Sequence, residues 1–434
     1  TYGRRSDWQN LYTIAKKYYE ALLADPGNAQ FHLTDPRGAS DKSGRTFNNP
    51  YQYVFEQMHM DDAIYADESI YEYPMQQGGG NDGRPYSFGR PSSGGSKAAY
   101  PCKSYGQGRI NPAYFYGIFD PNDMRRDVSI TMTGSNGKGV EKLIPFVPNS
   151  KAEGGGLTLN KWDENRQANP WVAAQRKSGI NGPYMRMSEV YLGYAEVCAA
   201  LGDVVTGKQY LKTVRERSFP QGLANTDAFI ASVGNDLVRA IIEERGFEYA
   251  GEGDRRWTLI RSGYLPEDIK RIKDMTKAMM DGLATKGYYE FENGNIISAY
   301  IWTKLVDAKT IYGHRLTAQC PTDKVNDPVL YPGWRGQKDN WEEMGLNYGS
   351  STPATNLAIK GLFEIVSEEE AASLESQGYA KVNWGIDLVD YRDEYDKYLF
   401  WDYDYVSAPI YLWPFTPNVM AAGGFTNGYG FKQE

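Results

Sequence analysis

Residues 184–201 read YMRMSEVYLGYAEVCAAL and form the clearest helical pattern in the chain. Their apolar and aromatic side chains recur at helical spacing and therefore share one face of a helix. Members of this stripe are Met187, Tyr191, Tyr194, Ala195, Cys198 and Leu201. Gly202 ends the helix, and residues 207–218 predict a second one with Leu211 and Val214 turned inward. The two helices predict an antiparallel hairpin of the tetratricopeptide type.

Further helices are expected on both sides of this hairpin. Apolar residues recur at helical spacing in the ranges 7–24, 49–60, 227–250, 266–281, 367–376 and 390–398. Residues 68–73 alternate instead, which predicts a short strand. No composition shift marks a domain linker. The sequence therefore predicts a mainly α fold: one domain over residues 1–434, few short strands, and a tetratricopeptide-like helical core over residues 184–261.

Glycine-rich stretches interrupt the helical pattern. Residues 76–108 are dominated by Gly, Ser, Pro, Tyr and Arg, and predict a long irregular loop insertion. A second stretch, Gly154 to Gly156, lies upstream of Trp162. The tail from 409 to 431 is rich in Pro, Gly and aromatic residues and also predicts a loop. Long loops inside a compact domain are often functional.

Tyrosine is the unusual component of the chain. The 434 residues contain 34 Tyr, 16 Phe and 10 Trp, and tyrosine combines an apolar ring with a polar tip. Such an excess suits a protein that meets sugars or peptides at its surface. The net charge of −8 and the absence of a basic block argue against nucleic acid and anionic membranes as partners. No apolar run reaches the roughly 18 residues that a membrane-spanning helix needs.

The residues that usually carry catalysis are sparse. His32, His59 and His314 are far apart and lack spaced partners for a metal site or a Ser–His–Asp triad. The glycine-rich runs lack the Lys-Ser/Thr ending of a phosphate-binding loop. The sequence therefore predicts no enzyme of these classes.

Paired carboxylates could still indicate a glycosidase. Four glutamates, Glu243, Glu244, Glu248 and Glu252, are interleaved with four arginines, Arg239, Arg245, Arg255 and Arg256. Glu244 and Glu248 share a helical face, and Arg245 stands three residues before Glu248, a spacing that favours ion pairs. Ion pairing lowers a carboxyl pKa, whereas a general acid needs a raised one. A structural role is therefore the better interpretation.

Three aspartates, Asp120, Asp123 and Asp127, stand in a turn with Arg125 and Arg126. Their oxygens make a calcium site a weak alternative, because no EF-hand spacing or glycine fits. We otherwise expect no cofactor and no metal.

The three cysteines, Cys102, Cys198 and Cys320, are widely spaced and give no C-x-x-C metal pattern. Cys198 lies on an apolar helical face and is expected to be a small core residue. A disulfide between Cys102 and Cys320 stays open as an alternative.

Aromatic residues in polar, glycine-rich surroundings are the remaining candidates for a binding site. The C–H face of a sugar ring stacks on an aromatic ring, while neighbouring polar side chains bond its hydroxyls. Candidates of this kind are Tyr86, Phe88, Tyr105, Trp162 and Trp171. Their alternative role is burial as anchors of the loops.

Several segments in the right order resemble the SusD/RagB family. Residues 184–196 resemble its helix R-L-A-E-V-Y-L-x-Y-A-E-A, and residues 211–217 its L-N-x-V-R-x-R helix. Residues 242–261 are similar to I-x-x-E-R-x-x-E-F-x-G-E-G-x-R-x-x-D-L-x-R, with Thr258 in place of Asp. Phe119 to Asp127 match a D-P-x-D-x-R-R turn. The tail from Tyr411 to Pro417 resembles Y-L-x-P-I-P. These motifs span about residue 119 to the end.

The resemblance implies a Bacteroidetes outer-membrane surface lipoprotein with a scaffold of tetratricopeptide-like helix pairs. Such a protein would take part in polysaccharide utilisation and nutrient uptake. It would be a lid on a SusC-like TonB-dependent transporter and capture glycans or, in RagB-type members, peptides. Family members begin with a lipid-anchoring Cys and an extra N-terminal helical portion, and we expect this chain to lack both. The matched motifs belong to the scaffold and carry no ligand residue across.

The sequence therefore predicts a non-catalytic binding protein that captures oligosaccharide at the extracellular face of the outer membrane. A peptide-binding capture protein is the main alternative. A glycoside hydrolase and a structural lid without ligand affinity are two others.

Overall fold

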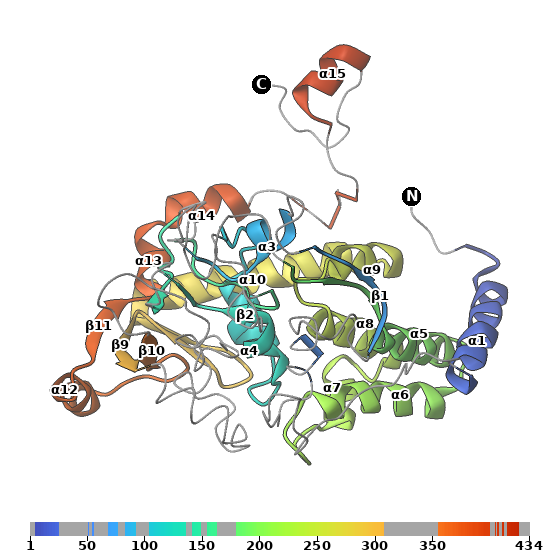
Figure 1. The fold of residues 1–434 in the computed structure, drawn as a ribbon, viewed down its shortest axis with the longest axis horizontal. Helices are drawn as coiled ribbons and strands as arrows, with labels where there is room; N and C mark the ends of the chain where they lie inside the picture. Colours follow the sequence, from blue (N-terminus) through green and yellow to red (C-terminus); the bar gives the residue numbers. More distant parts are fainter. Residues whose placement is uncertain are drawn as a thin grey trace.

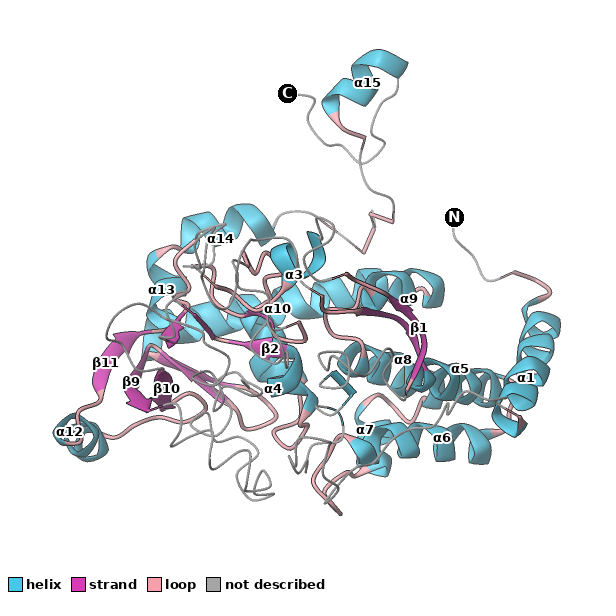
Figure 2. Cartoon of the chain, in the orientation of Figure 1, coloured by secondary structure: helices cyan, strands magenta, loops and turns pink. Residues whose placement is uncertain are grey.

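The computed structural model describes residues 5–25, 51, 54–55, 68–76, 83–92, 104–135, 141–148, 154–162, 179–307, 355–399, 404, 406–407, 410–411 and 415–424. Figure 1 shows these parts of the chain in sequence colours, and Figure 2 colours them by secondary structure. Helices dominate and the strands are short, as predicted. None of the described helices is long and apolar enough to cross a membrane.

The predicted hairpin is present. It consists of α5 (Met187–Ala200) and α6 (Val204–Arg217), which pack against each other through Leu192, Ala195, Leu211 and Val214. The side chain of Asp203 caps α6 by accepting a hydrogen bond from the amide of Thr206 at 3.3 Å. A hairpin of this kind is one unit of a tetratricopeptide array, and the array itself stays a prediction.

Two further helices extend the hairpin. α1 (Trp8–Ala24) packs on α5, where Tyr12, Tyr19 and Leu23 meet the apolar side of Tyr194 and Cys198. On the other side, α8 (Leu237–Glu248) packs against both α5 and α6. Figure 1 shows this helical group at one end of the molecule, with α1 outermost.

The single helix expected over residues 227–250 is wrong. The chain forms α7 (Thr226–Ser232) and α8, separated by a turn in which Gly234 and Asn235 adopt positive φ angles of 78° and 60°. Glycine tolerates that conformation and asparagine is among the few residues that adopt it readily, so the helix stops there. The side chains of Asn225 and Asp236 then cap the two helices by accepting bonds from the amides of Ala228 and Arg239.

Three other boundaries differ from the predicted ones. The helix expected to begin at residue 184 begins at Met187, because residues 182–186 form a strand. The loop insertion at 76–108 contains the short helix α3 (Gly83–Phe88), and the tail contains α15 (Pro417–Gly423). Pro417 stands in the first turn of α15, where its missing amide hydrogen costs nothing. The helix predicted over 49–60 lies mostly outside the described residues.

The second half of the molecule is organised around α10 (Leu265–Lys286), which follows α9 (Asp254–Ser262). Against it pack α13 (Gly385–Asp390) and the strand β7 (Tyr288–Glu290). The remaining described helical elements are α12 (Glu368–Ser376), α14 (Arg392–Leu399), α4 (Arg125–Ser129) and the π-helical turn Tyr114–Ile118.

The described strands pair in small antiparallel sheets. β9 (Tyr300–Asp307) is the centre of a three-stranded sheet between β10 (Thr355–Lys360) and β11 (Ala380–Asn383). The other sheets have two strands each: β1 (Ser69–Tyr73) with β6 (Gly182–Arg186), β2 (Ile130–Thr131) with β5 (Thr158–Leu159), β3 (Thr133–Ser135) with β4 (Glu141–Leu143), and β7 with β8 (Ile296–Ser298).

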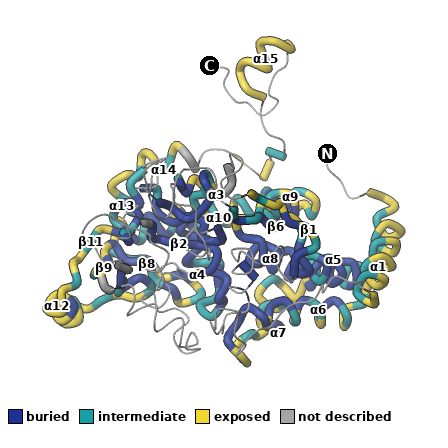
Figure 3. The backbone as a smooth tube through the Cα atoms, in the orientation of Figure 1, coloured by how far each residue is buried: buried dark blue, intermediate teal, exposed yellow. Residues whose placement is uncertain are grey.

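The main core is aromatic and lies between α10 and these strands, where Figure 3 shows the tube as buried. The indole of Trp384 is fully buried and donates a hydrogen bond to the hydroxyl of Tyr116 at 2.8 Å. The ring of Phe146 packs on Trp384, with 4.3 Å between the ring centroids. Tyr116 and Trp384 therefore belong to this core and satisfy each other there, because a buried Tyr or Trp needs a hydrogen-bond partner.

Candidate functional site

A buried network of charged side chains joins the segments that carry the family-like motifs. Glu248 of α8 accepts hydrogen bonds from Arg186 at 2.9 Å and from Arg125 at 3.2 Å, and it also pairs with Arg217. Glu244, one turn earlier, accepts from Arg125 at 2.7 Å and from Arg215 at 2.9 Å. All of these groups are almost fully buried.

The network continues beyond α8. Arg186 also binds Glu68 and Glu252, each at 2.9 Å, and Arg125 binds Asp123 at 2.7 Å. Lys161 donates to Glu252 at 2.6 Å and to the carbonyl oxygen of Glu248 at 3.2 Å. Among the residues that the structure describes, five cations thus face five carboxylates: Arg125, Arg186, Arg215, Arg217 and Lys161 against Glu68, Asp123, Glu244, Glu248 and Glu252.

The ion-paired role of the glutamates is confirmed. Glu243 binds two of the interleaved arginines, Arg239 at 2.7 Å and Arg255 at 2.8 Å, whereas the partners of Glu248 differ from the expected one. Burial alone would raise the pKa of Glu248, but Arg217, Arg186 and Arg125 outweigh it and leave the pKa well below its usual range. The predicted local pairing with Arg245 is wrong, because Arg245 binds Asp254 and approaches Glu189 at 3.5 Å. The partners of Glu248 are distant in sequence, and helical spacing could not identify them.

The aspartates of the 120–127 turn have similar roles. Asp123 binds Arg125, Asp127 binds Arg126 at 3.0 Å, and Asp120 accepts from the amide of Asn122 at 2.8 Å. In the described part of the chain, no three His, Cys, Asp or Glu side chains are grouped as metal ligands. The calcium alternative therefore has no support in this turn.

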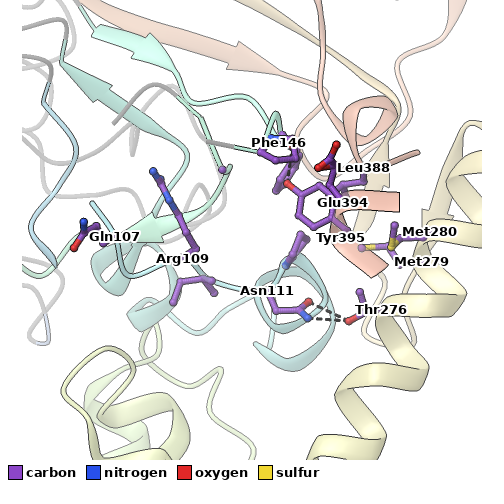
Figure 4. Close-up of a pocket in the computed structure, with 14 residues that line it drawn as sticks. Gln107, Arg109, Asn111, Phe146, Thr276, Met279, Met280, Leu388, Glu394 and Tyr395 are labelled. Carbon is purple, nitrogen blue, oxygen red and sulfur yellow. Dashed lines mark hydrogen bonds between the residues drawn. The ribbon is translucent and has the colours of Figure 1, made fainter. Parts of the chain in front are cut away.

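In the described part of the chain, a pocket of about 800 Å³ is a candidate for a ligand site (Figure 4). Its floor is apolar and consists of the buried side chains of Met279, Met280, Leu388 and Phe146. Its polar lining residues are Gln107, Arg109, Asn111, Thr276, Glu394 and Tyr395. An apolar interior with a few convergent polar groups is typical of small-molecule sites.

Distant segments position the polar groups around the pocket. Asn111 donates to Thr276 of α10 at 2.9 Å and accepts from the amide of Ala113 at 2.8 Å, so its side chain is held in place. Tyr395 of α14 is half-buried and donates to the carbonyl oxygen of Phe146 at 2.6 Å. Tyr395 is therefore the pocket aromatic that a ligand can reach, with its hydroxyl fixed by the backbone.

Arg109 is the cation of the pocket. Burial lowers the pKa of Arg109 to about 10, and the nearby Tyr395 opposes that shift. The guanidinium therefore stays charged at neutral pH. In Figure 4 its side chain lies on the opposite side of the pocket from Glu394. The site thus offers a cation, a carboxylate, two amides and one accessible ring.

The glycine run at 154–156 shapes this pocket. Gly155 has a φ angle of 88°, and a Cβ atom there would lie 2.8 Å from Nε of Arg109. Gly156 has a φ angle of 70°, and its Cβ atom would overlap the ring of Phe146. This glycine-rich stretch therefore allows the backbone to pass close behind two pocket residues, Arg109 and Phe146.

We expect Gly156→Ala to lower the free energy of unfolding by about 1–3 kcal/mol, because the new methyl group must displace the buried Phe146 ring. Gly202→Ala is the matched control, since Gly202 also has a positive φ angle, of 92°, but no atom within 4 Å of its Cβ position. Urea unfolding of both variants measures the difference. Equal losses would mean that backbone strain alone, and not the contact with Phe146, explains the glycine.

The residues predicted from sequence lie mostly beside this pocket and not in it. Tyr86 is buried and packs edge-on against Tyr105, with 4.9 Å between their centroids. Trp162 is also buried, in a cluster with Leu159 and Ile180 that packs on the pocket residue Ile110. Tyr86 and Trp162 are therefore buried anchors of loops, which is the alternative role of these aromatics.

Phe88 is 45% exposed and its ring lies against Gly108, next to Gln107 and Arg109. It is the candidate that keeps an accessible ring close to the pocket lining. Trp171 lies outside the described residues, as do Cys102 and Cys320. Cys198 is buried as a free thiol, as expected.

Sequence reasoning missed the pocket residues themselves. Arg109 follows Tyr105 by only four positions, and Phe146 stands between two prolines just before the glycine run. Tyr395 belongs to a charged helix with no distinguishing pattern. The glycine run was the available signal, but only the tertiary structure shows what it packs against.

Comparison with known proteins supports the resemblance. The model of the SusD family matches residues 30–415. The SusD-like protein P25 of Formosa agariphila is 28% identical over 160 residues, which are 37% of this chain and 26% of that protein.

The chain is also similar, at lower identity, to parts of solved structures. Surface glycan-binding protein A from Bacteroides thetaiotaomicron in complex with laminarihexaose is 19% identical, with a TM-score of 0.41, over 60% of this chain and 52% of that one. NanU of B. fragilis is 18% identical, with a TM-score of 0.38, over 59% and 52%. The chain thus matches about half the length of these structures and about a quarter of the curated relative.

Proposed function

Because this chain belongs to the SusD family, we propose that it is a non-catalytic capture protein that binds oligosaccharide in the pocket between α10, α14 and residues 107–112. The captured sugar would pass to a SusC-like TonB-dependent transporter at the extracellular face of the outer membrane, where the chain would be held by a lipid anchor. Dissociation constants of about micromolar to millimolar would suit a sugar that must be released to the transporter.

The observation that carries the proposal is the pairing of one accessible ring with surrounding polar groups. The C–H face of a sugar can stack on Tyr395, whose hydroxyl is already bonded to the backbone. Hydroxyls of the same sugar can bond Arg109, Gln107 and Glu394 at the polar rim. The volume of about 800 Å³ falls within the range of roughly 300–1,000 Å³ that is typical of ligand pockets.

The carboxylates also favour binding over hydrolysis. A glycosidase needs two carboxylates flanking the scissile bond, one of them with a raised pKa. In the described lining of the pocket, Glu394 is the one carboxylate, and it is exposed. The paired glutamates of α8 are held by arginines in the buried network instead.

We expect Tyr395→Ala to weaken oligosaccharide binding about tenfold or more, the effect of losing a central aromatic contact worth about 1.4 kcal/mol. Tyr395→Phe should keep most of the affinity, because the stacking ring remains. Tyr391→Ala is the matched control: it removes an exposed tyrosine one helical turn earlier, outside the pocket lining. Calorimetry with laminarihexaose and a panel of neutral and uronic-acid oligosaccharides measures the affinities.

Two results would overturn the proposal. If peptides bind and no sugar in the panel does, the chain is a peptide-capture protein of the RagB type. If sugars bind equally well to wild type and Tyr395→Ala, the pocket is not the site.

A further inference from the structure

The two-stranded ribbon formed by β1 and β6 exposes three tyrosines on one face. We call it the tyrosine ribbon: residues 68–76 together with residues 182–186. The pairing has register shifts between Ser69 and Tyr71 and between Tyr71 and Glu72. Glu72 and Arg186 are buried, whereas Tyr71, Tyr73 and Tyr184 are exposed by 54%, 54% and 73%. Neighbouring aromatic side chains with this much exposed area form a patch, and such patches often mark a binding surface.

The inner face holds the ribbon in one orientation. Asn181 donates to the buried carboxylate of Glu72 at 2.9 Å and accepts from the amide of Met75 at 2.9 Å. Arg186 donates to Glu68 and to Glu248, at 2.9 Å each. These bonds hold the inner face of the ribbon against distant segments, and Tyr71, Tyr73 and Tyr184 stay on the solvent side.

The outer face is aromatic, rigid and uncharged. The rings of Tyr71 and Tyr184 pack edge to face, with 5.5 Å between centroids and 83° between planes. Over residues 68–76 and 182–186, all of which the structure describes, the exposed side chains are Tyr71, Tyr73, Pro74, Gln76 and Tyr184. None of them is charged.

We propose that the tyrosine ribbon is a second carbohydrate-binding surface, which takes the extended part of a neutral polysaccharide outside the pocket. The inference rests on the proposed function. Tyrosine provides a large contact area with few side-chain torsions to order, and its hydroxyl can bond a sugar hydroxyl at the ring edge. Nucleic acid or an anionic membrane would require cations on this face, and a charged peptide would require opposite charges.

The ribbon and the pocket are built from different elements. The pocket lies among α10, α13 and α14, whereas β6 leads directly into α5, and Figure 1 draws the two regions well apart along the long axis. A ligand that reaches both surfaces gains avidity, while one that fills only the pocket does not. The ribbon should therefore matter for long chains and not for short fragments.

The experiment uses the double variant Tyr71→Ala/Tyr184→Ala and, as a matched control, Tyr18→Ala, which removes an equally exposed tyrosine on α1. Native gels containing laminarin, xyloglucan, galactomannan or starch measure retention of the whole chain by polysaccharide. We expect retention of the double variant to be weaker by about tenfold or more, because a second contact can raise overall affinity by roughly 10²–10⁴. Its calorimetric affinity for a hexasaccharide of the retained polymer should match that of the wild type. Tyr71→Phe/Tyr184→Phe should restore most of the retention.

The contrary outcomes are distinct. If wild type and double variant are retained equally, the ribbon is no carbohydrate surface, while the proposed function stands. If no polysaccharide retains the wild type and no hexasaccharide binds, both proposals fail. If the double substitution abolishes self-association in sedimentation runs and leaves retention unchanged, the ribbon binds a second copy of the chain.

Discussion

Replacing Glu248 with glutamine is expected to lower the free energy of unfolding by about 3–5 kcal/mol, the usual cost of removing one partner from a buried ion pair. Glutamine keeps the size of the side chain and its hydrogen-bonding oxygen, so the loss reports the charge. Arg125, Arg186 and Arg217 would each lose their ion pair with this carboxylate in a buried site from which water is excluded. Among the described members of the network, five cations would then face four carboxylates.

Urea unfolding followed by circular dichroism measures this loss. Glu375→Gln is the matched control, because Glu375 is an exposed residue of α12, and it should change stability by less than about 0.5 kcal/mol. A loss for Glu248→Gln as small as that of the control would mean that the network does not stabilise the fold.

Stability is expected to rise with pH above pH 8 because of Lys161. Burial lowers the pKa of Lys161 from 10.5 to about 8, an effect that Glu252 opposes and Arg186 reinforces. Between those two values the unfolded chain binds a proton that the folded chain does not, so raising the pH favours folding. The gain is about 1.4 kcal/mol per pH unit, and about 3 kcal/mol over the full interval.

The gain ends where tyrosines ionise. Burial raises the pKa of Tyr114 and Tyr116 above the ordinary value of 10, so the unfolded chain loses those protons first and stability falls above about pH 10. Denaturant midpoints are therefore measured between pH 7.5 and pH 9.5, below the range in which the tyrosines ionise.

The test compares Lys161→Met with the wild type over that range. The variant should have a flat profile, whereas Lys286→Met, which removes an exposed lysine at the end of α10, should keep the rise. A rise that persists in Lys161→Met would assign it to another group and refute the role of Lys161.

The helical part of the fold was predictable because its cause is local. Periodicity predicted α1, the hairpin of α5 and α6, α10 and α12, each within a few residues of its observed bounds except for the longer C-terminal end of α10. The predicted helix boundaries were wrong where one or two residues force the backbone out of, or into, the helical conformation. The turn at Gly234 and Asn235 divided one expected helix into two, and Pro417 began a helix in the expected loop.

The candidate site was predictable only in kind. Loop aromatics were a reasonable expectation in so tyrosine-rich a chain, yet the buried Tyr86 and Trp162 and the exposed Tyr71 and Tyr184 have similar local surroundings in sequence. Whether a ring is covered depends on which distant segment packs over it. Arg109, Phe146 and Tyr395 line one pocket although the first and the last are nearly 290 positions apart in the sequence, and no local sequence pattern predicts that contact.

The sequence by itself determined the helices, the ionic character of the motif glutamates and the family, because these follow from periodicity, composition and ordered motifs. Only the tertiary structure decided which arginines Glu248 binds, where the pocket lies and which tyrosines face solvent. Glu248 shows the physical reason. Helical spacing pairs it with Arg245, but burial strengthens ion pairs and makes every uncompensated charge costly. The fold therefore places three arginines from distant segments around this one carboxylate.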